Sequence, residues 1–171
     1  MKGAIFFSSR YGSTAQYAHW ISQATGLPAY DIKYNKADLT EYDFLVLGSP
    51  IIYYKLSIHK WVKRNLVRLA YKPIIFFSVS GAGAGSKLDG WIADSLPEDF
   101  ISRMHHVALR GRQIPEKLSF YDRMMLKIAG MANKDPVARK QELEGFDFMD
   151  KAGIAPIIKR IEELQQNMVW I

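Results

Sequence analysis

Residues 2–14 read KGAIFFSSRYGST, and this stretch decides the fold. Its first part, Lys2 to Phe7, is an apolar run with the length of a buried strand. Its second part is a polar loop that holds several hydroxyl groups and a glycine. Small and apolar residues then recur at helical spacing from Ala15 to Gly26, where a glycine is a natural helix stop. The order of elements is therefore strand, loop, helix.

The same alternation continues along the chain. Apolar runs predict further strands, and amphipathic periodicity predicts a helix after the third strand and another near the end. Ser49 and Pro50 are expected to end the third strand, and Pro156 conflicts with a final helix that begins near Asp147, so that start stays open. The expected strands are 29–33, 42–48, 74–79 and 104–109, and the expected helices are 58–69 and about 147–166.

Alternating strands and helices favour a parallel sheet, because right-handed crossovers of this length permit few other arrangements. The fold class is therefore α/β, a doubly wound five-stranded parallel sheet of order 2-1-3-4-5 with helices on both faces. Ligands bind such sheets outside the carboxyl ends of the strands, where the strand order reverses. The loops after strands one, three and four should therefore meet.

Composition excludes several classes of protein. The 171 residues suit one domain spanning residues 1–171, and 49% hydrophobic residues fit a globular core. The absence of cysteine excludes disulfides, thiolate catalysis and cysteine metal sites. No apolar run approaches the ~20 residues of a membrane span, and Met1 leads into a strand rather than a signal-peptide core. We expect a soluble cytoplasmic protein.

The net charge of +6 is concentrated in one segment. Residues 103–140 hold nine Lys or Arg against three acidic residues, whereas the rest of the chain is balanced. Much of this segment is an insertion, about residues 110–146, that a minimal doubly wound domain does not need. Such a patch suggests an anionic partner, which could be a substrate, a membrane surface or nucleic acid, but it could also be a solvated face.

The loop after the first strand suits a phosphate. It offers hydroxyls, a glycine that permits close backbone approach, and the positive end of the following helix dipole. It is neither a nucleotide-triphosphate P-loop nor a dinucleotide fingerprint. The alternative is an ordinary helix N-cap. The residues that would hold the phosphate are Ser9, Arg10, Tyr11, Gly12, Ser13 and Thr14.

The pattern Ser-x-x-Gly-x-Thr after the first strand resembles the phosphate loop of the flavodoxin family, and this resemblance implies a flavodoxin-like fold that binds flavin mononucleotide (FMN). Two further loops resemble the family's ring-contacting segments, with Tyr53 as the aromatic expected beside the isoalloxazine ring and Tyr54 as second choice. The resemblance implies that Ser49, Pro50, Ile51, Ile52 and Tyr53 cover one side of the ring, and that Ser78, Val79, Ser80, Gly81, Ala82 and Gly83 contact its edge.

Residues 107–110 and 120–128, the latter reading FYDRMMLKI, are similar to menaquinone-dependent protoporphyrinogen oxidases, a flavodoxin-fold group with an insertion before the last helix. This resemblance implies flavin-mediated oxidation of a tetrapyrrole, with electrons passed to a membrane quinone. Cationic side chains could pair with the tetrapyrrole carboxylates. The apolar stripe of the insertion could contact the macrocycle, a quinone tail or the inner face of the membrane, or simply pack on its own domain. The candidate substrate or partner residues are Arg110, Arg112, Lys117, Arg123 and Lys127.

Two other functions stay open. One is an electron carrier between protein partners, although carrier flavodoxins are typically acidic and the sequence pI is about 9.4. The other is a non-catalytic FMN module whose basic patch binds a partner. The aromatic motifs of RNA-binding modules are missing, so nucleic acid is not the expected partner. We expect no metal site and nominate no catalytic side chain, since the flavin itself transfers the electrons.

Overall fold

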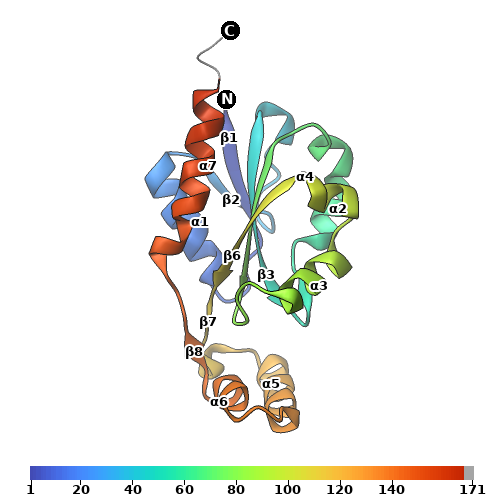
Figure 1. The fold of residues 1–171 in the computed structure, drawn as a ribbon, viewed down its shortest axis with the longest axis vertical. Helices are drawn as coiled ribbons and strands as arrows, with labels where there is room; N and C mark the ends of the chain where they lie inside the picture. The colour runs from blue at the N-terminus through green and yellow to red at the C-terminus, as the bar shows by residue number, and fades with distance from the viewer. Residues whose placement is uncertain (168–171) are drawn as a thin grey trace.

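A computed structural model describes residues 1–167 of the chain. Five parallel strands form the central sheet in the order β2-β1-β3-β5-β6, which is the predicted 2-1-3-4-5 arrangement, and the short β4, not predicted, pairs antiparallel with β3 (Figure 1). The α/β fold class is thus confirmed. The strands are β1 (Gly3–Phe7), β2 (Ala29–Asp31), β3 (Phe44–Ile52), β4 (Lys55–Leu56), β5 (Ile74–Ser80) and β6 (Met104–Arg110).

Helices cover both faces of this sheet. Helices α1 and α7 lie on one face, and α2, α3 and α4 lie on the other (Figure 1). Within a strand, successive side chains point to opposite faces, so neighbours such as Ile5 and Phe6 enter two different hydrophobic clusters. The helices are α1 (Ser13–Thr25), α2 (His59–Leu69), α3 (Ser86–Ser95), α4 (Glu98–Arg103) and α7 (Ala155–Gln166), and a 3₁₀ turn, η1, spans Leu39–Glu41.

Strand β3 is longer than its sequence predicted. It was expected to end at Gly48, but it continues through Pro50 to Ile52. Pairing with β1 stops at Gly48, whereas pairing with β5 continues to Pro50. Proline is tolerated there because a strand with one unpaired edge does not need every backbone N–H.

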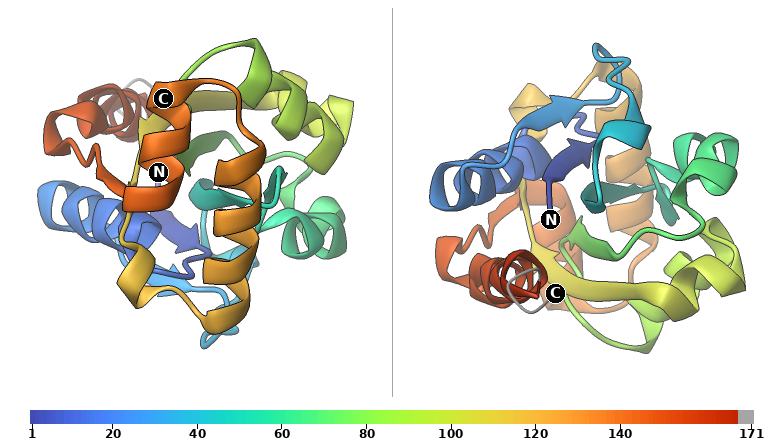
Figure 2. Two further views of the ribbon diagram at one scale, coloured as in Figure 1. Left: turned by 90° about the horizontal axis from the view of Figure 1, so that it is seen from below. Right: turned by 90° about the horizontal axis from the view of Figure 1, so that it is seen from above.

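The segment after β6 leaves the sheet and returns to it. It continues through β7 (Arg112–Gln113), forms two helices, and returns through β8 (Phe146–Asp147), which pairs antiparallel with β7. Figures 1 and 2 show this helical hairpin lying beyond the carboxyl ends of the parallel strands. Its other elements are the 3₁₀ turn η2 (Pro115–Lys117), α5 (Phe120–Ala132) and α6 (Pro136–Glu144).

The last helix begins later than residue 147. Residues 146–147 are in β8, a 3₁₀ turn, η3 (Lys151–Ile154), follows, and α7 starts at Ala155. Pro156 thus lies in the first helical turn, where its missing N–H has no intrahelical partner to lose. The conflict that Pro156 raised in the sequence is resolved by the later start. None of the helices within residues 1–167 has the length and apolarity needed to span a membrane.

Candidate functional site

The loop between β1 and α1 is shaped to receive a ligand. Gly12, the N-cap of α1, has φ of 100°, a left-handed conformation that bulky residues rarely adopt, and it has no side chain that could cap the helix. The N–H groups of Ser13 and Thr14, the first two of this helix, therefore remain available to an anion. The hydroxyl of Thr14 is buried and has no hydrogen-bond partner, which is a costly arrangement unless a ligand supplies one.

The other residues of this loop have varied surroundings. The Ser9 hydroxyl accepts a long hydrogen bond from the Ala15 N–H (3.4 Å). The Ser13 hydroxyl contacts the backbone of Arg112, accepting from its N–H at 3.2 Å and donating to its carbonyl at 3.3 Å. Arg10 and Tyr11 extend toward the insertion. The loop is therefore tied to β7 and α5 as well as to its own helix.

The second loop is a tight turn between β3 and β4. Tyr53 and Tyr54 both have positive φ, 48° and 64°, as the primed turns of two-residue hairpins require. Bulky residues pay for this conformation with strain that is commonly found at functional sites. Both residues are exposed, at 49% and 66% of their accessible surface. Pro50, Ile51 and Ile52 lie in β3 just before the turn.

The hydroxyl of Ser49 is directed into the protein. It accepts a hydrogen bond from the Ile58 N–H (3.1 Å) and donates to the Pro50 carbonyl (3.0 Å). Its side chain therefore organises the start of α2.

The third loop follows β5, and three of the residues predicted to contact the ring edge, Ser78, Val79 and Ser80, lie in the strand itself rather than in the loop. Ser78 is fully buried and pairs with the His106 Nε2 (2.8 Å), and Val79 packs in the hydrophobic core. Burial lowers the pKa of His106. By contrast, the Ser80 hydroxyl is buried without a hydrogen-bond partner. Ala82 and the glycines that follow Ser80 form the exposed or half-buried end of the loop.

Arg110 holds this third loop in place. Its Nε and Nη2 atoms donate to the Gly81 carbonyl at 3.1 and 2.6 Å, and its guanidinium lies 3.7 Å from the centre of the Phe148 ring. The Phe146 ring fills the space that a side chain at Gly81 would occupy. Arg110 therefore braces a backbone segment rather than pointing freely to solvent.

Replacing Arg110 with Lys should loosen the third loop while preserving the charge. Lysine cannot donate two fixed hydrogen bonds to one carbonyl or stack its head group on Phe148 as a planar fork does. We expect a loss of about 1 kcal/mol in urea unfolding and faster hydrogen exchange at residues 81–85. Arg112→Lys is the control, because only the backbone of Arg112 contacts Ser13. Equal behaviour of the two variants would contradict the bracing role.

The remaining basic candidates are not brought together as one cluster. Arg123 donates from Nε to the Pro115 carbonyl (3.0 Å) and from Nη2 to the Glu116 carbonyl (2.7 Å), so it stabilises the start of the insertion. Arg112, Lys117 and Lys127 are exposed. Arg110 is exposed as well, but its guanidinium is bonded to the Gly81 carbonyl, so Arg112, Lys117 and Lys127 are the candidates better able to meet an anionic molecule.

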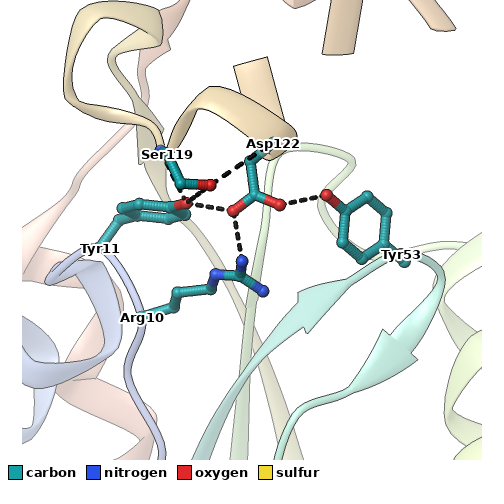
Figure 3. Close-up of polar contacts among 5 residues, drawn as sticks. All are labelled: Arg10, Tyr11, Tyr53, Ser119 and Asp122. Carbon is teal, nitrogen blue, oxygen red and sulfur yellow. Dashed lines mark hydrogen bonds and ion pairs between the residues drawn. The ribbon is translucent and has the colours of Figure 1, made fainter. Parts of the chain in front are cut away.

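Asp122 on α5 connects the insertion to the first two loops. Its carboxylate accepts hydrogen bonds from the Tyr11 and Tyr53 hydroxyls and forms an ion pair with Arg10 at 2.6 Å (Figure 3). Ser119, the N-cap of α5, accepts from the Asp122 N–H at 3.2 Å. Sequence reasoning did not nominate Asp122 or Ser119, although the Ser-x-x-Asp pattern that begins α5 is a helix-start signal.

The charges in this cluster stabilise one another. Burial disfavours the Asp122 carboxylate, but hydrogen bonds from Tyr11 and Tyr53 and the charge of Arg10 outweigh burial and lower the pKa of Asp122. Partial burial and the hydrogen bond to Asp122 raise the pKa of Tyr53 to about 12. Asp122 is therefore ionised and Tyr53 is protonated across the physiological range.

The residues present fit FMN. Two buried hydroxyls, of Thr14 and Ser80, lack partners, and they belong to the segments predicted to hold the phosphate and to contact the ring edge. The left-handed Gly12 leaves open space at the phosphate loop, since nothing lies within 4 Å of the position a Cβ would take. Among residues 1–167 there is no group of three or more His, Asp or Glu side chains that could hold a metal ion.

Comparisons with known proteins place the chain in a family. The model of the flavodoxin domain family matches residues 4–138. No curated protein matches the sequence.

Several solved structures are similar. They include an FMN complex of a flavoprotein from Lactobacillus acidophilus (14% identity, TM-score 0.46, 64% of this chain and 91% of that chain). They also include FMN-bound flavodoxin from Fusobacterium nucleatum (11% identity, TM-score 0.45, 70% of this chain and 75% of that chain). A third is an NADPH-quinone reductase from P. pentosaceus (12% identity, TM-score 0.44, 79% of this chain and 99% of that chain). The family assignment rests on the family model, which spans most of the sequence. The chain belongs to the flavodoxin domain family.

Proposed function

We propose that this protein binds FMN noncovalently at the carboxyl ends of β1, β3 and β5 and acts as an FMN-dependent oxidoreductase. The observation that carries the proposal is the Thr14 hydroxyl, buried without a partner in the loop after β1 of a flavodoxin-family chain. A phosphate oxygen is the acceptor that this hydroxyl and the free N–H groups of α1 would share.

FMN supplies the one- and two-electron chemistry when it is bound. The protein's own residues bind and orient it. The loop 9–14 would hold the phosphate, Tyr53 would lie against the ring, and the Ser80 hydroxyl with the neighbouring backbone would contact the polar edge of the ring. No side chain is required to move a proton in this scheme.

A reduced tetrapyrrole is the proposed electron donor, and a quinone is the proposed acceptor. The similarity of residues 107–110 and 120–128 to quinone-linked protoporphyrinogen oxidases supports this choice. The placement of the insertion supports it too, because α5 contacts two FMN loops through Asp122. Arg112, Lys117 and Lys127 are the exposed cations available to the substrate's carboxylates.

A second candidate function is electron carriage between protein partners. The exposure of Tyr53 and Tyr54 favours it, since a partner protein could approach the ring side of the site. Reduction by a flavodoxin reductase with onward transfer, and no porphyrinogen turnover, would select this alternative.

The first test is whether the protein retains FMN. The purified protein is mixed with FMN, the free excess is removed, and the visible spectrum is recorded for the wild type and for a Ser9→Ala, Thr14→Val variant. A retained flavin band that the variant weakens supports the proposal. A folded wild-type protein without a retained band would overturn it.

The second test separates the two candidate functions. The FMN-loaded protein is supplied with protoporphyrinogen and a soluble quinone, and porphyrin fluorescence is followed. Turnover that stops without the quinone supports the oxidase. Retained FMN without porphyrin formation above the uncatalysed rate would exclude the oxidase and leave the carrier.

We further propose that α5 contacts the inner surface of an anionic membrane, where a quinone is available to a cytoplasmic protein. One face of this helix exposes large apolar side chains, and basic residues flank them. Ile128 and Met131 are 52% and 65% exposed. The other members of the apolar face are Phe120, Tyr121 and Met124.

Replacing Ile128 and Met131 with Ser should weaken binding to anionic vesicles by about tenfold, because each substitution removes apolar area from the lipid contact. Co-sedimentation with phosphatidylglycerol vesicles measures this binding. Val67→Ser, at a position on α2 that is 90% exposed, is the matched control and should bind as the wild type does. Wild-type binding that is equal for neutral and anionic vesicles, or absent, would contradict the membrane contact.

A further inference from the structure

Asp122 is a buried carboxylate with partners from distant parts of the sequence. Its side chain is 9% exposed, and its carboxylate is bonded to Arg10 and Tyr11 after β1 and to Tyr53 after β3. Figure 3 shows the carboxylate between the two tyrosines, with the Arg10 guanidinium on a third side. One side chain of the insertion thus holds both the phosphate loop and the ring loop.

This arrangement is not what helix capping alone would produce. An acidic side chain three residues after a serine N-cap normally reaches back to the N-cap N–H. Here the Ser119 N–H donates to the Tyr11 hydroxyl instead (3.2 Å), and the Asp122 carboxylate is directed at the loops. The carboxylate therefore serves a contact between segments of the fold.

The contact engages Arg10 and Tyr11 of the phosphate loop but not Thr14. Asp122 binds side chains of the loop, whereas the Thr14 hydroxyl keeps no partner. Closing α5 onto the loops therefore does not occupy the group that a phosphate would need.

Among the partners of Asp122, Tyr53 is the residue expected beside the isoalloxazine ring. Its backbone is held at φ of 48°, and its hydroxyl is fixed by Asp122 while the edge of its ring meets Tyr121 of α5 at a centroid distance of 6.4 Å. A phenol held at its oxygen end has little freedom to rotate away from its position. The insertion thereby fixes the orientation of the aromatic side chain in the ring loop.

We propose that Asp122 is a positioning residue for the flavin: through the Tyr53 hydroxyl and the Arg10 guanidinium it docks α5 over the site, fixes the Tyr53 ring and slows release of FMN. The inference rests on the proposed binding of FMN. It adds that the insertion is part of the cofactor site as well as a surface for a substrate or membrane.

The test compares Asp122→Asn and Tyr53→Phe, singly and together, with Asp135→Asn as control. Asp135 caps α6 in the same insertion through the Val137 N–H but lies outside the Asp122 contacts. Asparagine keeps the shape of Asp122 without its charge, and phenylalanine keeps the ring without the hydroxyl. Three readouts are used: the FMN dissociation rate, the visible circular dichroism of bound FMN, and hydrogen exchange of residues 120–132 in FMN-free protein.

We expect Asp122→Asn to accelerate FMN release by about tenfold, since a charge-assisted hydrogen-bond set is lost. It should also alter the flavin dichroism and speed exchange in α5. Tyr53→Phe should accelerate FMN release less than Asp122→Asn does. The double variant should release FMN no faster than Asp122→Asn, because both substitutions remove the same contact between Tyr53 and Asp122. Asp135→Asn should leave release and dichroism unchanged.

The outcomes separate this inference from the proposed function. Faster exchange in α5 with unchanged FMN release and dichroism would overturn it, because Asp122 would then only stabilise the insertion. Wild-type protein that retains no FMN would overturn the proposed function and this inference with it. Wild-type retention with additive effects of the two substitutions would show that Asp122 does not act through Tyr53.

Discussion

Thr14→Val is expected to weaken FMN binding by about ten- to a hundredfold and, at the same time, to stabilise the FMN-free protein. The hydroxyl is buried without a partner, so replacing it with a methyl group of similar shape removes an unsatisfied polar group worth about 1 kcal/mol or more. When FMN is present, the same hydroxyl would donate to a charged phosphate, which is a stronger hydrogen bond. The two effects therefore have opposite signs.

Fluorescence titration measures the affinity, and thermal unfolding of the FMN-free protein should show a rise of about 2–4 °C. Thr25→Val is the control, since Thr25 is on the same helix but donates to the Ile21 carbonyl at 2.7 Å. That variant should lose stability and keep the affinity of the wild type. A Thr14→Val variant with unchanged affinity would remove Thr14 from the phosphate site.

Gly48→Ala should destabilise the protein by about 3 kcal/mol. Gly48 is registered opposite Phe77 on β5, and an added Cβ would lie 2.2 Å from the tip of the Phe77 ring. Gly3 has the same relation to Phe44 on β3. In each pair, a ring on the neighbouring strand fills the space above a glycine, so overpacking must shift a buried aromatic or the sheet itself.

Urea unfolding of a double-mutant cycle with Phe77→Leu tests this explanation. The cost of Gly48→Ala should fall by at least about 1 kcal/mol in the Phe77→Leu background, because the clashing ring is absent. Gly90→Ala is the matched control. Gly90 is within α3 with open space around it, so alanine there should stabilise the helix by about 0.5–1 kcal/mol. Additive costs at positions 48 and 77 would contradict the steric explanation.

Local pattern was sufficient to predict most of the framework. Apolar runs such as residues 2–7 and 74–79 are buried strands because they are covered on both faces, and that burial leaves an unambiguous signal. Helices α3 and α4 were not predicted. The errors in the bounds of predicted elements occurred where neighbouring strands decide the outcome. Pro50 remains in a strand because β1 has already stopped pairing, and Asp147 is in β8 because β7 lies beside it.

The candidate site was predictable to a different degree. The loop 9–14 was recognisable because its hydroxyls, its glycine and its place after the first strand are local properties. Asp122 was not, since its partners are 69 to 112 residues away in sequence. The orientation of the Arg110 side chain could not be predicted either, because the Gly81 carbonyl that accepts its hydrogen bonds belongs to the loop after another strand.

The sequence by itself therefore determined the order of the five parallel strands, the fold class and the position of the ligand loops, because hydrophobic periodicity and loop composition act within a few residues of the chain. Only the tertiary structure decided which polar groups face one another. It placed the insertion at the carboxyl edge of the sheet, left the Thr14 and Ser80 hydroxyls without partners, and brought Asp122 to Arg10, Tyr11 and Tyr53. Such contacts depend on how the sheet and the insertion close on each other, and no local pattern encodes that geometry.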